Sequence, residues 1–389
     1  MMADGAPGLA RDVPTLPLDV GGRRVVLVHD WLTGMRGGEK VLESLCRLFP
    51  DADLLTLVQV PGSVSPTIEA RRIRTSFVQR LPMRARLYRH YLPLFPMAIE
   101  GFDLDDADLV VSTSHCAAKS VVPTGRAVHV CYCHSPMRYA WDQFEAYFGR
   151  ARIGPLAAAA ARPVLAWLAR WDRATAGRVT HFVANSQFVA GRIARYYNRP
   201  ASVLHPPVDT RFFTPANGPS APYFLVVSAL VPYKRIDVAV RAATRLGVRL
   251  KVVGTGPDLT RLQAQAGPLV EFLGALPPDE LREAYRNALA LVLPAEEDFG
   301  IAPVESMACG RPVIALGRGG ATETVVDGVT GLLVDDHTDA AFADTMDRIR
   351  RTSFDSDALV RHADRFSTAR FEEGLRTTLT GALAGPSPC

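Results

Sequence analysis

The sequence lacks the segments that would carry a chain into or across a membrane. Its 389 residues contain no apolar run of the ~18–20 residues that a transmembrane helix needs. The first 20 residues hold no apolar stretch of the kind found in a secretory signal. The net charge of +4 is too small to indicate nucleic-acid binding by itself. We therefore expect a globular protein of the cytoplasm.

The cysteines do not show the spacing of a zinc site. There are six of them, and no pair is followed by a second pair at ligand spacing. Cys131 and Cys133 alternate with Val130 and Tyr132, as expected for one face of a strand. This usage indicates buried free thiols in a reducing compartment.

The length of the chain predicts two domains, because single cores rarely grow beyond ~250–300 residues. Short apolar runs alternate with helical patterns in both halves, which predicts parallel sheets with right-handed crossovers. A break rich in Pro and Gly, residues 215–222, separates the halves. We expect a flexible tail over 1–22, Rossmann-like domains over 23–210 and 211–366, and a final helix and tail over 367–389.

The most informative segment is residues 294–316, PAEEDFGIAPVESMACGRPVIAL. It reads as the end of a strand, a loop, a short helix and a second strand, with Glu297 in the loop and Glu305 in the helix. Parallel sheets bind ligands at the carboxyl ends of their strands, and two carboxylates suit a ligand rich in hydroxyls. Gly300 would let the backbone approach a ligand closely. The alternative is a solvated acidic loop before a helix N-terminus.

Three turns in the second half also follow predicted strands. Lys234 and Arg235 stand near the start of a helix, where they form an anion site or remain two solvated surface cations. Gly254 belongs to a Gly-x-Gly-Pro turn, which a plain tight turn would explain equally well. Glu323, in Gly-Gly-Ala-Thr-Glu, is a ligand or an exposed acid at a helix start.

The first half offers a glycine loop and a histidine. Gly37 and Gly38 follow a strand and open a helix, which is the context of a phosphate contact. His134 follows the strand at 128–133 and would face a cleft, although a single histidine is more often a cap or a core residue. Asn185 and Ser186 follow the next strand, as ligands or as the N-cap of a helix.

Together these segments resemble the retaining glycosyltransferases of family 4, and the resemblance covers residues from about Val25 to about Leu383. It implies the GT-B fold: two Rossmann-like doubly wound domains facing a cleft, with the C-terminal helix packing back on the first, acceptor-side domain. In the second, donor-binding domain, Glu297 would contact the transferred sugar and Glu305 the ribose. Many members carry Arg where this chain has Ala229.

The resemblance also assigns roles to the other residues. The implied catalytic set is His134, Glu297, Lys234 and Arg235, with the two cations holding the diphosphate. The implied donor-binding set is Gly37, Gly38, Gly254, Leu276, Phe299, Gly300, Ile301 and Glu305.

Three motifs look most like the bacterial mannosyltransferases that use GDP-mannose: HDWL at 29–32, CHSPMRY at 133–139 and VPYKR at 231–235. This implies transfer of mannose, with retention, to a hydroxyl of a glycan or lipid-linked glycan during synthesis of a cell-surface polysaccharide. No metal and no cofactor are expected, and the acidic cluster at 103–108 is interpreted as solvated turn residues.

Other interpretations stay open. The donor could be a UDP-sugar, and the fold could serve a non-hydrolysing nucleotide-sugar epimerase or a non-catalytic nucleotide-sugar binding protein. Arginines mixed with aromatic residues over 71–95, and an Ala-rich stretch with tryptophans over 154–177, suit the anionic inner face of a membrane. Nothing in the sequence matches a nucleic-acid recognition motif.

Overall fold

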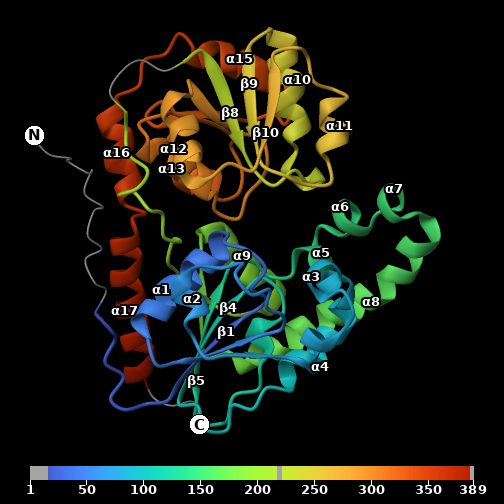
Figure 1. Cartoon of the computed structure of the whole chain (residues 1–389), viewed down its shortest axis with the longest axis vertical. Helices are drawn as coiled ribbons and strands as arrows, with labels where there is room; N and C mark the ends of the chain where they lie inside the picture. Colours follow the sequence, from blue (N-terminus) through green and yellow to red (C-terminus); the bar gives the residue numbers. More distant parts are fainter. Residues whose placement is uncertain (1–15, 217–220, 386–389) are drawn as a thin grey trace, which may run out of the picture.

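The computed structural model describes residues 16–216 and 221–385, which form two α/β units, one above the other in Figure 1. Each unit is built on one sheet whose strands are all parallel, and most strand residues are buried, apart from those of three edge strands. Continuous apolar strands of this kind need helices on both faces, because neither face meets water. The predicted class of two doubly wound α/β domains is confirmed.

The first sheet has seven strands. In spatial order they are β3 (Ile73–Thr75), β2 (Asp53–Thr56), β1 (Val25–His29), β4 (Leu109–Ser114), β5 (Val128–Cys133), β6 (His181–Ala184) and β7 (Ala201–Val203).

The second sheet has six strands. In spatial order they are β10 (Val270–Gly274), β9 (Arg249–Val253), β8 (Tyr223–Val227), β11 (Ala290–Leu293), β12 (Val313–Leu316) and β13 (Gly331–Val334).

Helices connect the strands. The first unit holds α1 (Gly37–Leu48), α2 (Pro66–Glu69), α3 (Arg84–Leu87), α4 (Phe95–Glu100), α5 (Arg138–Trp141), α6 (Phe144–Phe148), α7 (Arg150–Ile153), α8 (Pro155–Ala174) and α9 (Gln187–Tyr197). The second holds α10 (Ile236–Leu246), α11 (Leu259–Gln263), α12 (Pro278–Asn287), α13 (Ile301–Ala308), α14 (Ala321–Thr324), α15 (Asp339–Ile349) and α16 (Ser356–Asp364), and α17 (Thr368–Ala384) ends the described chain.

The order of the strands fixes where a ligand can bind. In the first sheet, successive strands are added outward in one direction from β1 and in the opposite direction from β4. In the second sheet, the same reversal lies between β8 and β11. In open α/β sheets the crevice at such a reversal lies at the carboxyl ends of the strands. The loops that follow β1, β5, β8 and β11 carry most of the residues predicted as the site.

Helix α17 returns to the first domain, as predicted. Val208 forms a bridge with Ser367 at the link between the domains, and α17 then runs down beside α1 in Figure 1. Phe371, Leu375 and Leu379 recur every four residues on one face of this helix and join the core cluster of the first sheet. Burying this stripe ties the end of the chain to its beginning.

The predicted flexible tail differs from the structure in its second part. Residues 1–15 lie outside the described residues. Leu18 and Val20 pack against the core of the first domain, and the Leu18 amide donates a hydrogen bond to the Leu48 carbonyl at 3.0 Å. Their apolar side chains hold this part of the tail in place.

Helix α8 is fixed to the first domain by a buried ion pair. The side chains of Lys119 and Asp172 are 1% and 0% exposed, and their charged atoms lie 3.0 Å apart. Asp172 also accepts hydrogen bonds from Trp141 Nε1 at 2.8 Å and from the Tyr197 hydroxyl at 2.9 Å. Neither α8 nor any other helix among the described residues is long and apolar enough to cross a membrane.

Replacing Lys119 by Met should therefore leave a buried carboxylate without its cation. We expect the free energy of unfolding, measured by urea denaturation, to fall by about 3–5 kcal/mol. The matched control is Glu145→Gln, which removes the exposed pair with Arg162 and should cost less than about 1 kcal/mol. Equal losses in the two variants would contradict this role of the pair.

Candidate active site

The loop after β11 brings Glu297 against a cation from the loop after β8. Lys234 Nζ lies 2.5 Å from each carboxylate oxygen of Glu297, and the two side chains are 18% and 11% exposed. Glu297 also forms a backbone bridge with Gly319, which fixes the loop from its other side. A mostly buried carboxylate needs such a partner, because removing its charge from water is costly. The two residues form a mostly buried ion pair.

Glu305 takes its partners from both domains. Its Oε2 accepts a hydrogen bond from the Tyr285 hydroxyl at 2.8 Å, and its Oε1 lies 3.0 Å from Lys40 Nζ. Lys40 belongs to α1 of the first domain, directly after the glycine loop. Burial raises the pKa of Tyr285, and the neighbouring Glu305 raises it further, so Tyr285 remains a hydrogen-bond donor.

Phe299, a predicted donor-binding residue, anchors the loop with its ring. Its side chain is 3% exposed and lies in the core of the second domain, stacked on His205 at 5.3 Å and beside Phe366. Its ring therefore anchors the loop and is not offered to a ligand. Gly300 follows with φ of +89°, a conformation that favours glycine, and α13 begins at Ile301.

The glycines of the predicted site have packing reasons as well. A Cβ on Gly254 would lie 1.8 Å from the Ser228 carbonyl oxygen, so only glycine allows these two turns to touch. A Cβ on Gly37 would lie 2.7 Å from Ile301 Cδ1, which places the glycine loop of the first domain against the donor segment of the second. Leu276 is partly buried against the core of the second domain.

Arg235 does not join Lys234 at Glu297. Its Nε lies 3.3 Å from Asp237, and its backbone φ is +48°. Burial works to raise the pKa of Asp237, but the charge of Arg235 and a hydrogen bond from Arg241 outweigh it and lower that pKa. Ala229, the position where many family members carry Arg, is exposed.

His134 stands at the carboxyl end of β5. Its carbonyl accepts a hydrogen bond from Asn185 Nδ2 at 3.0 Å, and its ring lies between Tyr132 and His115, with centroids 5.2 and 6.3 Å away. Its Nε2 has no partner in the described structure and faces Gly38, where a Cβ would lie at 3.4 Å. Burial lowers the pKa of His134 to about 3, and the nearby His115 and His29 add to the effect.

A neutral His134 makes stability depend on pH in one direction. Its ordinary pKa of 6.5 applies to the unfolded chain, so only the unfolded state takes up this proton between pH 6.5 and about 3. The free energy of unfolding should then fall with falling pH, by up to about 1.4 kcal/mol per pH unit for this group.

In the variant His134→Gln this contribution should vanish. The free energy of unfolding, measured by urea denaturation at a series of pH values, should then fall less steeply between pH 6.5 and 4 than it does in the wild type. Buried His129, whose pKa burial lowers to about 4, offers a second histidine for comparison. An imidazole signal of His134 that titrates between pH 6 and 8 would contradict the assignment.

Several contacts between the two domains were not predicted from the sequence. The Arg138 guanidinium binds the Asp298 carboxylate, with Nε at 2.9 Å, and the Ser186 hydroxyl donates to the Asp298 carbonyl at 2.5 Å. These partners stand 160 and 112 residues apart in the chain, so one sequence gives no signal for the pairing. The same holds for Lys40 and Glu305, 265 residues apart.

Glu323 caps a helix of the other domain. Its carboxylate accepts the amides of Gln187 at 2.8 Å and Phe188 at 3.0 Å, which open α9, and lies 3.2 Å from His205 Nε2. The Ser186 hydroxyl accepts the Val189 amide at 3.0 Å, so its predicted role as an N-cap is confirmed. The structure thus gives Glu323 a structural task at the domain interface.

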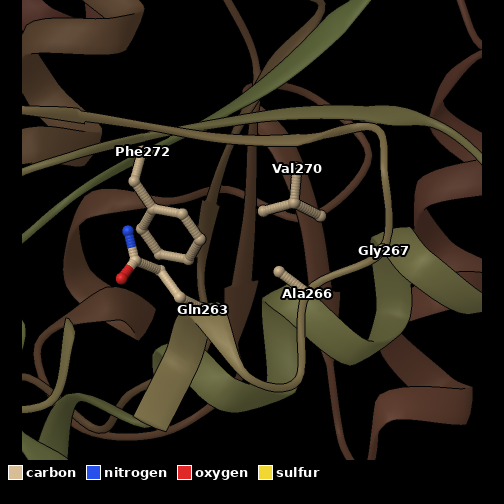
Figure 2. Close-up of a pocket in the computed structure, with 5 residues that line it drawn as sticks. All are labelled: Gln263, Ala266, Gly267, Val270 and Phe272. Atoms are coloured by element: carbon tan, nitrogen blue, oxygen red, sulfur yellow. The ribbon is translucent and has the colours of Figure 1, made fainter. Parts of the chain in front are cut away.

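A shallow hollow elsewhere in the second domain holds none of the predicted site residues. Figure 2 shows it between α11 and β10, lined by Gln263, Ala266, Gly267, Val270 and Phe272. It carries no charged side chain, so it does not offer what a phosphate would need.

Two family models match the chain in succession. The model of Glycosyltransferase Family 4 matches residues 35–212, and that of Glycosyl transferases group 1 matches residues 209–365. The chain therefore carries two glycosyltransferase domains.

Solved structures of other proteins share the fold of these two domains. The Anabaena protein Alr3699/HepE in complex with UDP aligns with 92% of this chain and 100% of its own, with a TM-score of 0.66 and 16% identity. Sucrose-phosphate synthase from Thermosynechococcus elongatus aligns with 93% of this chain and 100% of its own, with a TM-score of 0.69 and 18% identity. At such identities the likeness concerns the fold, and it confirms the predicted GT-B arrangement of the glycosyltransferase domains.

Curated relatives match over a shorter range. A D-inositol 3-phosphate glycosyltransferase of Acidothermus cellulolyticus is 36% identical over 216 residues, 47% of this chain and 48% of that protein. One of Mycolicibacterium smegmatis is 32% identical over 229 residues, 52% and 53% of the two chains. The chain spans about half the length of the curated relatives it matches.

Proposed function

We propose that the protein is a retaining glycosyltransferase that moves a hexosyl group from a nucleotide-sugar to a hydroxyl acceptor. The observation that carries this proposal is that Glu297, bound to Lys234, and Glu305, bound to Lys40 of the first domain, lie where two glycosyltransferase domains meet. Neutral His134 stands at the end of β5 in the first domain and faces the glycine loop.

In this proposal Glu305 accepts the ribose hydroxyls and Glu297 the hydroxyls of the sugar. Lys234 stabilises the charge that develops on the departing diphosphate, and Arg235 provides a second cation at the same turn. The anomeric C–O bond to phosphate breaks while the acceptor oxygen bonds to the same face. The acceptor proton passes to the leaving phosphate oxygen.

The proposal includes two further features. The uncharged His134 can hydrogen-bond the sugar through its free Nε2 without adding a charge near the anomeric carbon. Closure of the two domains on the substrates would exclude water from the reacting atoms and so limit hydrolysis. No metal is part of this proposal, because Lys234 already stands at the position proposed for the diphosphate.

The donor has two candidates, each with its own support. GDP-mannose is supported by HDWL, CHSPMRY and VPYKR, which resemble bacterial mannosyltransferases. A UDP-sugar is supported by structures of the Anabaena protein Alr3699/HepE in complex with UDP and with UDP-glucose. The acceptor is proposed to be a glycan or lipid-linked glycan of a cell-surface polysaccharide. A phosphorylated cyclitol is the second candidate, because curated relatives are named as D-inositol 3-phosphate glycosyltransferases.

A panel of GDP, UDP and ADP with their sugars should identify the donor by thermal stabilisation. A nucleotide at 100 times its dissociation constant adds about 2.7 kcal/mol of stability. The nucleotide-sugar that stabilises the protein is then incubated with the protein and with glycan, lipid-linked or inositol 3-phosphate acceptors. Products are detected by mass spectrometry.

Glu297→Ala should lower transfer by about 100- to 1,000-fold in a folded protein. Wild-type turnover in this variant would contradict the site assignment. Conversion of the donor without any acceptor would favour an epimerase, and nucleotide binding without any product would favour a binding protein.

We also propose that the first domain docks on an anionic membrane surface. Met83 is 61% exposed next to α3, and Leu156 and Trp167 are 86% and 42% exposed on α8. Arg84, Arg86, Arg162 and Arg170 are exposed on the same helices, and α3 and α8 lie on the side opposite α17 in Figure 1. Apolar residues among arginines suit the headgroup region of an anionic bilayer.

Leu156→Ser should weaken co-sedimentation with phosphatidylglycerol vesicles by about tenfold. Val329→Ser, which changes a 53% exposed apolar residue of the second domain, should leave it unchanged. Vesicles of neutral lipid, or high salt, should abolish binding of the wild type. Equal binding to neutral vesicles would contradict the docking proposal.

A further inference from the structure

We propose that Arg138, Asn185, Ser186 and Asp298 form an interdomain clasp, and that Arg138 and Asp298 are positioning residues for glycosyl transfer. The clasp joins the loop that carries His134 to the loop that carries Glu297. This inference rests on the proposed function, because it concerns the geometry of the same reaction.

The ion pair is the strongest part of the clasp. Arg138 Nε lies 2.9 Å from Asp298 Oδ2, and Nη2 donates to the same oxygen. The two side chains are 16% and 14% exposed. Although burial opposes the charge, Asp298 and Glu297 raise the pKa of Arg138 above its usual range, so it stays a cation. An ion pair so little exposed to water is screened far less than a surface pair.

Asn185 and Ser186 extend the clasp through hydrogen bonds. Asn185 Nδ2 donates to the His134 carbonyl at 3.0 Å, and the Ser186 hydroxyl donates to the Asp298 carbonyl at 2.5 Å. The two side chains also contact each other, with Ser186 Oγ 3.1 Å from Asn185 Oδ1. A continuous path of polar contacts therefore runs from the backbone of His134 to the backbone beside Glu297.

Asp298 lies next to Glu297 in the chain, so a displacement of Asp298 would also displace Glu297. Glu297, on one side, is bound to Lys234, and Phe299, on the other, is fixed in the core of the second domain. Among the described residues, the Asp298 carboxylate contacts Arg138 of the first domain. The position of the Glu297 loop relative to His134 is thus set across the domain interface.

The carboxylate of Asp298 is occupied by Arg138, so neither residue needs to touch a substrate. Their effect would arise through placement, because a displacement of about 1 Å at reacting groups can cost about 100-fold in rate. Loss of the pair should therefore lower kcat more than it weakens nucleotide binding, which depends on Glu305 and Lys234 within the second domain.

The test compares Arg138→Met, Asp298→Asn, their double variant and Arg138→Lys with the wild type. The matched control is Arg126→Met, an arginine of the first domain paired with Asp108 away from the cleft. We measure kcat and KM for the donor, the nucleotide dissociation constant by calorimetry, and the radius of gyration by small-angle scattering. Circular dichroism checks that each variant is folded.

Arg138→Met and Asp298→Asn should each lower kcat by about 100-fold, while the nucleotide dissociation constant changes by less than about threefold. The kcat of the double variant should be no lower than that of the less active single variant, because each single substitution already removes the same interaction. Arg138→Lys keeps the charge and should recover part of the rate. Losses that multiply in the double variant, or kcat within about threefold of the wild type, would overturn the proposal.

Scattering separates a failure of the clasp from a failure of the proposed function. If the wild type transfers no sugar from any donor, the proposed function fails, while the clasp still predicts a larger radius of gyration in Arg138→Met than in Arg126→Met. Equal radii in these two variants would overturn the clasp itself.

Discussion

The cost of burying carboxylates at a domain interface is the constraint on which the rest of the structure depends. Three acidic residues of the second domain, Asp298, Glu305 and Glu323, are largely withdrawn from water. Each is compensated by donors of the first domain: an arginine, a lysine and the free amides of α9. A buried carboxylate without such partners would be strongly destabilising. The pairing that makes burial possible therefore also fixes how the two domains face each other.

The fold was largely predictable because parallel strands buried on both faces leave a strong signal. The predicted strand at 128–133 matches β5 residue for residue. The return of the last helix was expected from the resemblance and is carried by a stripe of apolar residues. The short helices between 77 and 100 were not predicted, because segments of four to seven residues show no periodicity. Packing of Leu18 and Val20 depends on tertiary contacts that composition does not reveal.

The candidate site was predictable where residue type and strand ends coincide. Glu297, Lys234 and His134 all follow strands, and the structure brings the first two into contact. Matching motifs could not show which residues contact a ligand and which serve packing. Gly254 leaves room for the Ser228 carbonyl oxygen, and the ring of Phe299 lies in the core. Arg138 belongs to the CHSPMRY motif and Lys40 follows the predicted glycine loop by two residues, yet their partners lie in the other domain. Only the fold shows that these pairs exist.

The central claim is that one nucleotide-sugar binds between the two domains, on groups contributed by both. A crystal structure of the protein with the stabilising donor tests it most directly. The account predicts the ribose at Glu305, the diphosphate at Lys234 and the sugar between Glu297 and His134. A donor bound elsewhere, such as the hollow between α11 and β10 in Figure 2, or bound in the cleft without contact to either glutamate, would contradict it.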